Sequence, residues 1–254
     1  MKVFLRFYEE LNQFLPSAQQ KTLIELDLKQ RSTVKDVIES MGVPHTEVDL
    51  ILINGESVEF DQLLEDQDRV SVFPMFESFD ISSVTKLREA PLRQRTDHGL
   101  RFVVDVNLGK LAHFLRMLGF DVVYHPDLYE DAVLAAISEQ EHRILLTRDL
   151  GLLKRKNVHH GYYLRNRHPT QQILEVLRRF DLLHSTDLCA RCLECNTPVV
   201  EIAKDRVIDR IPARVAESYD EFFICPDCQK IYWQGTHFQD MKKKLEQWQK
   251  ELSP

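Results

Sequence analysis

Long hydrophobic runs are absent from this sequence. No apolar stretch approaches the roughly 18 residues that a bilayer-spanning helix requires. The first residues, MKVFLRFYEEL, contain acids where an export signal would need a long apolar run. Glycine and proline are also few, at 8 and 10 of 254 residues, and low-complexity tracts and internal repeats are absent. We therefore expect a folded cytoplasmic protein of two or three small domains, with no membrane partner.

The cysteine content argues against a disulfide framework. All five cysteines lie between residues 189 and 228, and four of them form two C-x-x-C pairs. An odd number of clustered cysteines without an export signal is typical of metal binding rather than of disulfide bonding.

Charge is distributed unevenly along the chain. Residues 1–80 contain 7 Lys and Arg against 16 Asp and Glu, whereas residues 81–254 contain 26 against 24. The net charge of -7 therefore neither favours nor excludes a polyanionic partner, although local basic clusters could bind one.

Residues 1–80 are expected to form one small α+β domain. KVFLRFY and TLIELDL alternate as strands do, and Ser32 or Thr33 can cap a helix, VKDVIESM, that ends at Gly42. LILING and RVSVFP are two further strands. Strand, strand, helix, strand, strand is the β-grasp order. The segment resembles the ubiquitin-like sulfur carriers, but it lacks their terminal di-glycine. We expect a docking or stabilising role rather than a carrier role.

Residues 81–99 are interpreted as a polar linker. From residue 100 to residue 185, strands and helices alternate: LRFVVD, a helix GKLAHFLRML capped by Asn107, DVVYH, EDAVLAAISEQ, RILLT, GLLKRK, HGYYL, and a helix QQILEVLRRF capped by Thr170. This alternation predicts a parallel sheet with helices on both faces.

Acidic residues follow two strands of the predicted sheet. Asp105 ends the first strand, Asp149 follows the third, and Asp131 opens the helix between them. Ligands of open parallel sheets lie beyond the carboxyl ends of the strands, and hard divalent ions prefer oxygen ligands. The alternative for each residue alone is a capping or turn role. Asp127 and Glu130 are substitute ligands.

This region also resembles a known family. FVVDVNLGKLAHFLRMLGFDVVY, DAVLAAI, RILLTRDLGLLKR, RCLECN and CPDCQKIYWQGTH are similar to the Mut-seven C-terminal RNase family, a branch of the PIN-like nucleases. A ubiquitin-like head often precedes this domain. The resemblance implies that Asp105, Asp131 and Asp149 bind catalytic Mg²⁺ or Mn²⁺. The fourth acid of the PIN pattern has no counterpart in GKLAHFLRML, and Asp127 is the nearest candidate.

Basic residues near these acids are candidates for contacts with RNA phosphate. Lys110 lies in the first turn after the first strand, and Arg148 adjoins Asp149. Residues 141–168 contain seven Arg and Lys against two acids. The alternative is a solvated helix face. Tyr162 and Tyr163 could stack on bases, although a core position is expected for at least one of them.

Residues 186–254 contain the paired cysteines and an amphipathic segment that predicts a terminal helix. The four thiolates of Cys192, Cys195, Cys225 and Cys228 can complete the tetrahedron of a structural zinc site in a zinc ribbon. Alternative ligands are Cys189 and His237. Tyr232 and Trp233 are expected to pack over the metal.

The sequence thus predicts an α/β chain, in which a PIN-like domain (100–185) lies between a β-grasp domain (1–80) and a zinc ribbon (186–254). The expected function is metal-dependent hydrolysis of single-stranded or structured cellular RNA. The alternative is a non-catalytic RNA- or ribosome-associated binding or adaptor protein. A protein partner bound through residues 1–80 is a further expectation.

Overall fold

The computed structural model describes residues 1–76, 80–87, 99–127 and 130–252. Most of the predicted linker, residues 88–98, lies outside the described part. The chain divides into two compact units, residues 1–100 with 130–163 and residues 101–129 with 164–254. No helix in the described ranges is both long enough and apolar enough to cross a membrane.

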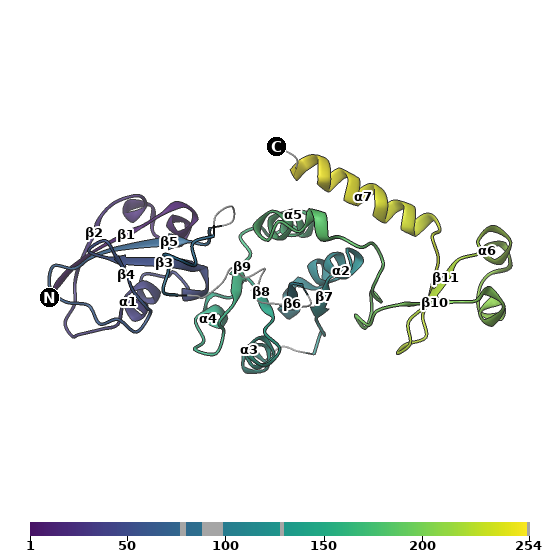
Figure 1. Cartoon of the computed structure of the whole chain (residues 1–254), viewed down its shortest axis with the longest axis horizontal. Coiled ribbons are helices and arrows are strands. Elements are labelled where there is room, and N and C mark those ends of the chain that lie inside the picture. The colour runs from purple at the N-terminus through teal and green to yellow at the C-terminus, as the bar shows by residue number, and fades with distance from the viewer. Residues whose placement is uncertain (77–79, 88–98, 128–129, 253–254) are drawn as a thin grey trace. The chain divides into compact units, whose positions relative to one another are not determined.

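The N-terminal domain is a mixed five-stranded sheet with one α-helix (Figure 1). Its elements are β1 (Lys2–Phe7), η1 (Glu9–Phe14), η2 (Ser17–Gln19), β2 (Ile24–Asp27), α1 (Val34–Ser40), η3 (His45–Glu47), β3 (Val48–Ile53), β4 (Glu56–Ser57) and β5 (Arg69–Pro74). The strand order is β2-β1-β5-β3-β4, with β1 and β5 parallel and the other pairs antiparallel. The predicted β-grasp arrangement is confirmed.

Local sequence accounts for these elements. In β1 the side chains alternate between exposed or partly exposed and buried, and Val3, Leu5 and Phe7 enter the core. Thr33 caps α1, because its side chain accepts a hydrogen bond from the Asp36 amide. Gly42 follows α1 with a φ of 98°, a conformation that suits glycine at a helix end.

The central sheet has four strands in the order β7-β6-β8-β9. Its strands are β6 (Arg101–Val104), β7 (Asp121–Val123), β8 (Ile144–Thr147) and β9 (Gly161–Tyr163). The pairs β6–β7 and β8–β9 are parallel, as the alternation of strands and helices predicts. The strands are short and almost wholly apolar, and β8 is buried at all four positions, which is typical of a sheet covered on both faces.

The helices that accompany this sheet begin differently from the prediction. They are α2 (Gly109–Met117), α3 (Asp131–Gln140), α4 (Leu150–Leu153) and α5 (Pro169–Arg179), with the turns η5 (Val106–Leu108) and η6 (Leu183–Ser185). Asn107 does not cap α2. Asp105 caps η5 instead, and α2 follows without a side-chain cap. Thr170 does not cap α5 either, because Pro169 already opens that helix. Proline favours the first helical position, since it has no N–H to leave unpaired.

The C-terminal part of the second unit is a small three-stranded antiparallel sheet followed by a long helix (Figure 1). Its elements are β10 (Val200–Ile202), η7 (Lys204–Arg206), η8 (Ile208–Arg210), α6 (Ala213–Ser218), β11 (Phe222–Ile224), β12 (Ile231–Tyr232) and α7 (Thr236–Leu252). Val207, Ile211, Val215 and Phe222 form its own small core. The predicted terminal helix is present, and only part of the strand-like run VVEIAKDRVID forms a strand.

Candidate functional site

The two C-x-x-C pairs converge on one point. The Sγ atoms of Cys192, Cys195, Cys225 and Cys228 all lie within 4.8 Å of one another. Two of the separations are short, 3.5 Å from Cys192 to Cys228 and 3.3 Å from Cys195 to Cys225. A tetrahedral ion with Zn–S bonds of about 2.3 Å needs separations of about 3.8 Å. The four thiols can therefore hold one such ion.

The residues around this four-cysteine cluster fix its loops. Cys192 accepts a hydrogen bond from the Tyr232 hydroxyl at 3.1 Å, and that oxygen accepts one from the Leu193 amide at 3.2 Å. The expectation that Tyr232 packs beside the cluster agrees with these bonds. Cys189 lies apart, with its Sγ 3.5 Å from Met241 Sδ. Neither Cys189 nor His237 belongs to the described group of ligand atoms.

Arg116 of α2 connects the four-cysteine cluster to β7. Its side chain is only 5% exposed. The guanidinium donates to the carbonyls of Leu193 and Glu194, which lie between Cys192 and Cys195. It also donates to Val122 and Tyr124 at and beyond β7. Burial lowers the pKa of Arg116, whereas the neighbouring cysteines oppose that shift. The motifs of the sequence do not single out this residue. Its one signal was an arginine on the apolar helix GKLAHFLRML.

Further bonds join the same two segments. Asn196 accepts from the Val122 amide at 2.9 Å and donates to Asp121 at 2.8 Å.

Gly119 approaches the carbonyl of Asp187 so closely that a Cβ would lie 2.4 Å from that oxygen. Gly119 also has a φ of 90°, which other residues rarely adopt. Both the space and the backbone conformation therefore require glycine at residue 119.

Two of the predicted acidic ligands, Asp105 and Asp149, follow strands of the central sheet. Asp105 directly follows β6 and is 8% exposed. Its Oδ1 accepts from the Asn107 amide at 3.1 Å. Asp149 lies two residues after β8, is exposed, and caps α4 through Oδ1, which accepts from the amides of Gly151 and Leu152. Asp105 belongs to the second unit and Asp149 to the first.

Asp131 and Asp127 differ from these two residues in their surroundings. Asp131 is exposed and is the first residue of α3. At this position its negative charge interacts favourably with the helix dipole. Asp127 is 84% exposed, with its carboxylate 3.4 Å from Nδ1 of His125. Its place as the fourth acid remains a prediction.

The basic residues of the 141–168 span have several different surroundings. Arg143 is buried and pairs with Glu141 at 2.7 Å, and Arg165 lies 3.9 Å from Glu175. Lys154 donates to the carbonyl of Glu39 at the end of α1. Lys110 is exposed and Arg148 is partly exposed. Phosphate binding by Lys110 and Arg148 remains a prediction.

Within the first unit, the β-grasp domain packs against the α4–β9 segment. Glu47 is 1% exposed and accepts from the Tyr163 amide at 2.7 Å. His45 bridges the two parts, with Nδ1 2.6 Å from Glu39 Oε1 and Nε2 2.8 Å from the Val158 carbonyl. Phe14 meets the ring of Tyr163 edge to face. These contacts join the head to the α4–β9 segment, and the docking or stabilising role of the head remains a prediction.

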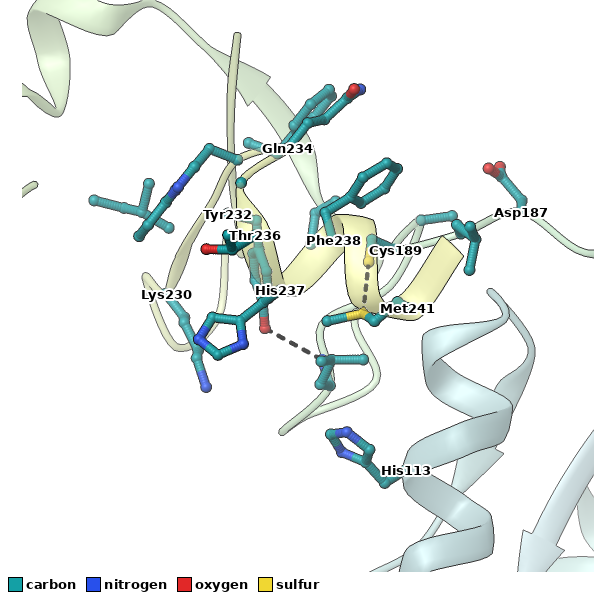
Figure 2. A pocket seen from close by; sticks show the side chains of 18 residues that line it. His113, Asp187, Cys189, Lys230, Tyr232, Gln234, Thr236, His237, Phe238 and Met241 are labelled. Atoms are coloured by element: carbon teal, nitrogen blue, oxygen red, sulfur yellow. Dashed lines mark hydrogen bonds between the residues drawn. The ribbon is translucent and has the colours of Figure 1, made fainter. Parts of the chain in front are cut away.

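A cavity of about 890 Å³ lies in the second unit between the four-cysteine region, α2 and α7 (Figure 2). Aromatic rings line part of it, those of Phe223, Tyr232, Trp233 and Phe238. Its polar groups include Lys230, Gln234, Thr236 and His237, and Cys189 and Met241 are among its apolar groups. Partial burial lowers the pKa of His113, which also lines the cavity, and so favours the neutral form of its ring.

Comparison with known proteins gives two family matches. Residues 1–80 match the model described as Mut7-C ubiquitin, and residues 100–245 match the model described as Mut7-C RNAse domain. Searches among curated proteins and among solved structures found no match. The second family match extends over the central sheet and the four-cysteine cluster and covers more than half of the chain. The chain therefore belongs to the Mut7-C RNAse domain family.

Proposed function

We propose that this protein is a metal-dependent ribonuclease that hydrolyses RNA phosphodiester bonds. The observation that carries the proposal is the match of residues 100–245 to the Mut7-C RNAse domain. It is supported by the positions of the acids, because Asp105 follows β6 and Asp149 follows β8. Residues that follow the strands of a parallel sheet lie on its ligand-binding edge.

The donor set suits Mg²⁺ or Mn²⁺. Asp105, Asp131 and Asp149 offer carboxylate oxygens, which hard divalent ions prefer. When bound, such an ion supplies an activated water and stabilises the charge on the leaving oxygen. The chain's own residues hold the ion and the substrate. In this proposal Lys110 and Arg148 position the RNA backbone through its phosphates, a contact that does not read sequence.

The capping role of two of these acids allows a sharp test. In Asp149→Asn the remaining amide oxygen still accepts from the Gly151 and Leu152 amides, and asparagine is as good a cap as aspartate. The variant therefore loses the charge but keeps the cap. Asp149→Ala loses both, which costs about 1 kcal/mol of stability. Asp105→Asn is designed on the same principle, and Asp205→Asn, at an exposed turn, is the matched control.

The assay is cleavage of labelled single-stranded RNA with and without Mn²⁺. We expect Asp105→Asn, Asp131→Asn and Asp149→Asn to lose activity by orders of magnitude while their thermal unfolding is nearly unchanged. Asp205→Asn should retain the parent rate. Undiminished cleavage in excess chelator, or Asp105→Asn as active as the parent, would contradict the proposal and indicate a contaminating nuclease.

A second candidate function is a non-catalytic RNA- or ribosome-associated binding module. The observation that favours it is that Asp105 and Asp149 already cap η5 and α4, so their presence has an explanation without a metal. In addition, α2 contains no carboxylate that could be the fourth acid. RNA binding without any metal-dependent cleavage would support this second function.

The four-cysteine cluster is proposed to bind structural zinc. Four thiolates form a closed shell with no open position for substrate. The cluster therefore stabilises the fold and takes no part in the hydrolysis.

A further inference from the structure

The cavity between β12, α7 and α2 is a second candidate site, separate from the acids that follow the strands. It is lined by residues of the second unit only, so its walls belong to one compact body. Its volume of about 890 Å³ falls within the range of small-molecule sites, about 300–1,000 Å³. Nothing in the ribonuclease proposal uses it.

One side of the cavity suits an anion. Figure 2 draws Lys230, Thr236 and His237 on one side of the cavity and Asp187 on the opposite side. Lys230 pairs with Glu194 at 2.7 Å, but the two side chains are 47% and 66% exposed, so the pair is weak and Lys230 can exchange it for a phosphate. The first-turn amides of the 17-residue helix α7, which begins at Thr236, have no partners within the helix and add to this character.

The remaining wall suits a flat aromatic ligand. Phe223, Tyr232, Trp233 and Phe238 are only partly buried, so the apolar core does not use all of their surface. The Tyr232 hydroxyl is already engaged by Cys192 and Leu193, so Tyr232 contributes its ring alone. Gly235 allows the Trp233 indole to lie against the start of α7, where a Cβ would be 2.6 Å from Nε1. Base–aromatic stacking is tolerant of sequence and contributes about 1–3 kcal/mol per base.

We propose that this cavity binds one nucleotide of single-stranded RNA, with the base against the aromatic wall and the phosphate at Lys230. The inference rests on the proposed function, because RNA is the ligand that a ribonuclease meets. An apolar peptide would leave the anion-binding side unpaired, which is why a nucleotide fits better. The cavity thus holds substrate at a place distinct from the cleavage chemistry.

The test measures binding rather than cleavage. Fluorescence anisotropy with a labelled oligouridine, without added Mg²⁺ or Mn²⁺, compares the zinc-loaded full chain with its variants. Lys230→Ala should weaken binding and reduce the salt slope by about 0.7, the value for one contact with a single-stranded phosphate. Phe238→Ala should weaken binding about 5- to 150-fold. Lys250→Ala is the matched control, since Lys250 is exposed near the other end of α7 and does not line the cavity.

A second measurement uses the unmutated protein, so its result does not depend on whether the variants fold. Cys189 lines the cavity and lies outside the four-cysteine cluster, so oligouridine should slow its alkylation by N-ethylmaleimide in the unmutated protein, followed by peptide mass spectrometry. Burial raises the pKa of Cys189, which lowers the fraction of its reactive thiolate. Unchanged affinity in both Lys230→Ala and Phe238→Ala, an equal loss in Lys250→Ala, or no protection of Cys189 would overturn the proposal.

The outcomes also separate this inference from the ribonuclease proposal. Loss of cleavage in Asp149→Asn together with unaltered binding in Lys230→Ala would reject the nucleotide cavity alone. Weakened binding in Lys230→Ala in a protein that never cleaves RNA would reject the ribonuclease alone. An apolar fluorescent probe that occupies the cavity and is not displaced by oligouridine would indicate an apolar partner instead.

Discussion

Replacement of Arg116 by methionine tests whether the four-cysteine cluster is part of the nuclease fold or an appendage to it. Methionine preserves most of the apolar stem and removes the guanidinium. Four carbonyls then lose their donor, two beside β7 and two between Cys192 and Cys195. At about 1 kcal/mol for each acceptor, the free energy of unfolding should fall by about 4 kcal/mol. The arginine is also a buried cation that contacts the loop between Cys192 and Cys195. A metal bound by four thiolates has a net charge of -2, so metal affinity should fall as well.

Two assays measure these effects. Both tryptophans, Trp233 and Trp248, lie in the second unit, so urea unfolding followed by tryptophan fluorescence reports on that unit. A loss of about 4 kcal/mol corresponds to a fall of the urea midpoint by more than about 1 M. Competition with a chromogenic chelator measures metal retention. Arg116→Lys keeps the charge without the forked geometry, and should recover part of the metal affinity but little of the stability.

Arg214→Met is the control, because Arg214 is an exposed arginine on α6 and its change should be within about 0.5 kcal/mol. If Arg116→Met unfolds at the same urea concentration as the parent and keeps its metal equally well, the reasoning fails. The cluster would then be an independent module.

Two further predictions concern the cysteines and the head. Purified protein should contain about one zinc per chain, Cys192→Ser should lose it, and Cys189→Ser should retain it, all by elemental analysis. Well under one zinc in protein prepared without chelators would contradict this. In the first unit, Glu47→Ala leaves the Tyr163 amide without its buried acceptor and should cost about 1–3 kcal/mol, seen as faster proteolysis between the head and β9. The control Glu56→Ala changes an exposed residue and should be cleaved at the same rate as the parent. If Glu47→Ala is also cleaved at the parent rate, the contact of Glu47 with Tyr163 does not stabilise the packing of the head.

Much of the fold could be predicted from the sequence because the patterns are local. The alternation in KVFLRFY, the cap at Thr33 and the glycine at residue 42 each depend on a few neighbouring residues, and each is present in the structure. The C-x-x-C spacing likewise identified four thiols that do converge. The predicted caps at Asn107 and Thr170 were wrong, because Asp105 caps the short turn η5 that precedes α2, and Pro169 opens α5 one residue before Thr170.

Most strands and helices and the four-cysteine cluster could thus be predicted from the sequence, which also proposes the candidate acids. Which distant residues share a surface depends on the tertiary fold. Arg116 is 76 residues from Cys192 along the chain, and Glu47 is 116 residues from Tyr163. No periodicity or spacing links such pairs, because their partners are backbone carbonyls and amides, which every residue carries. The cavity could not be predicted from the sequence for the same reason, because its lining residues come from segments that only folding brings together.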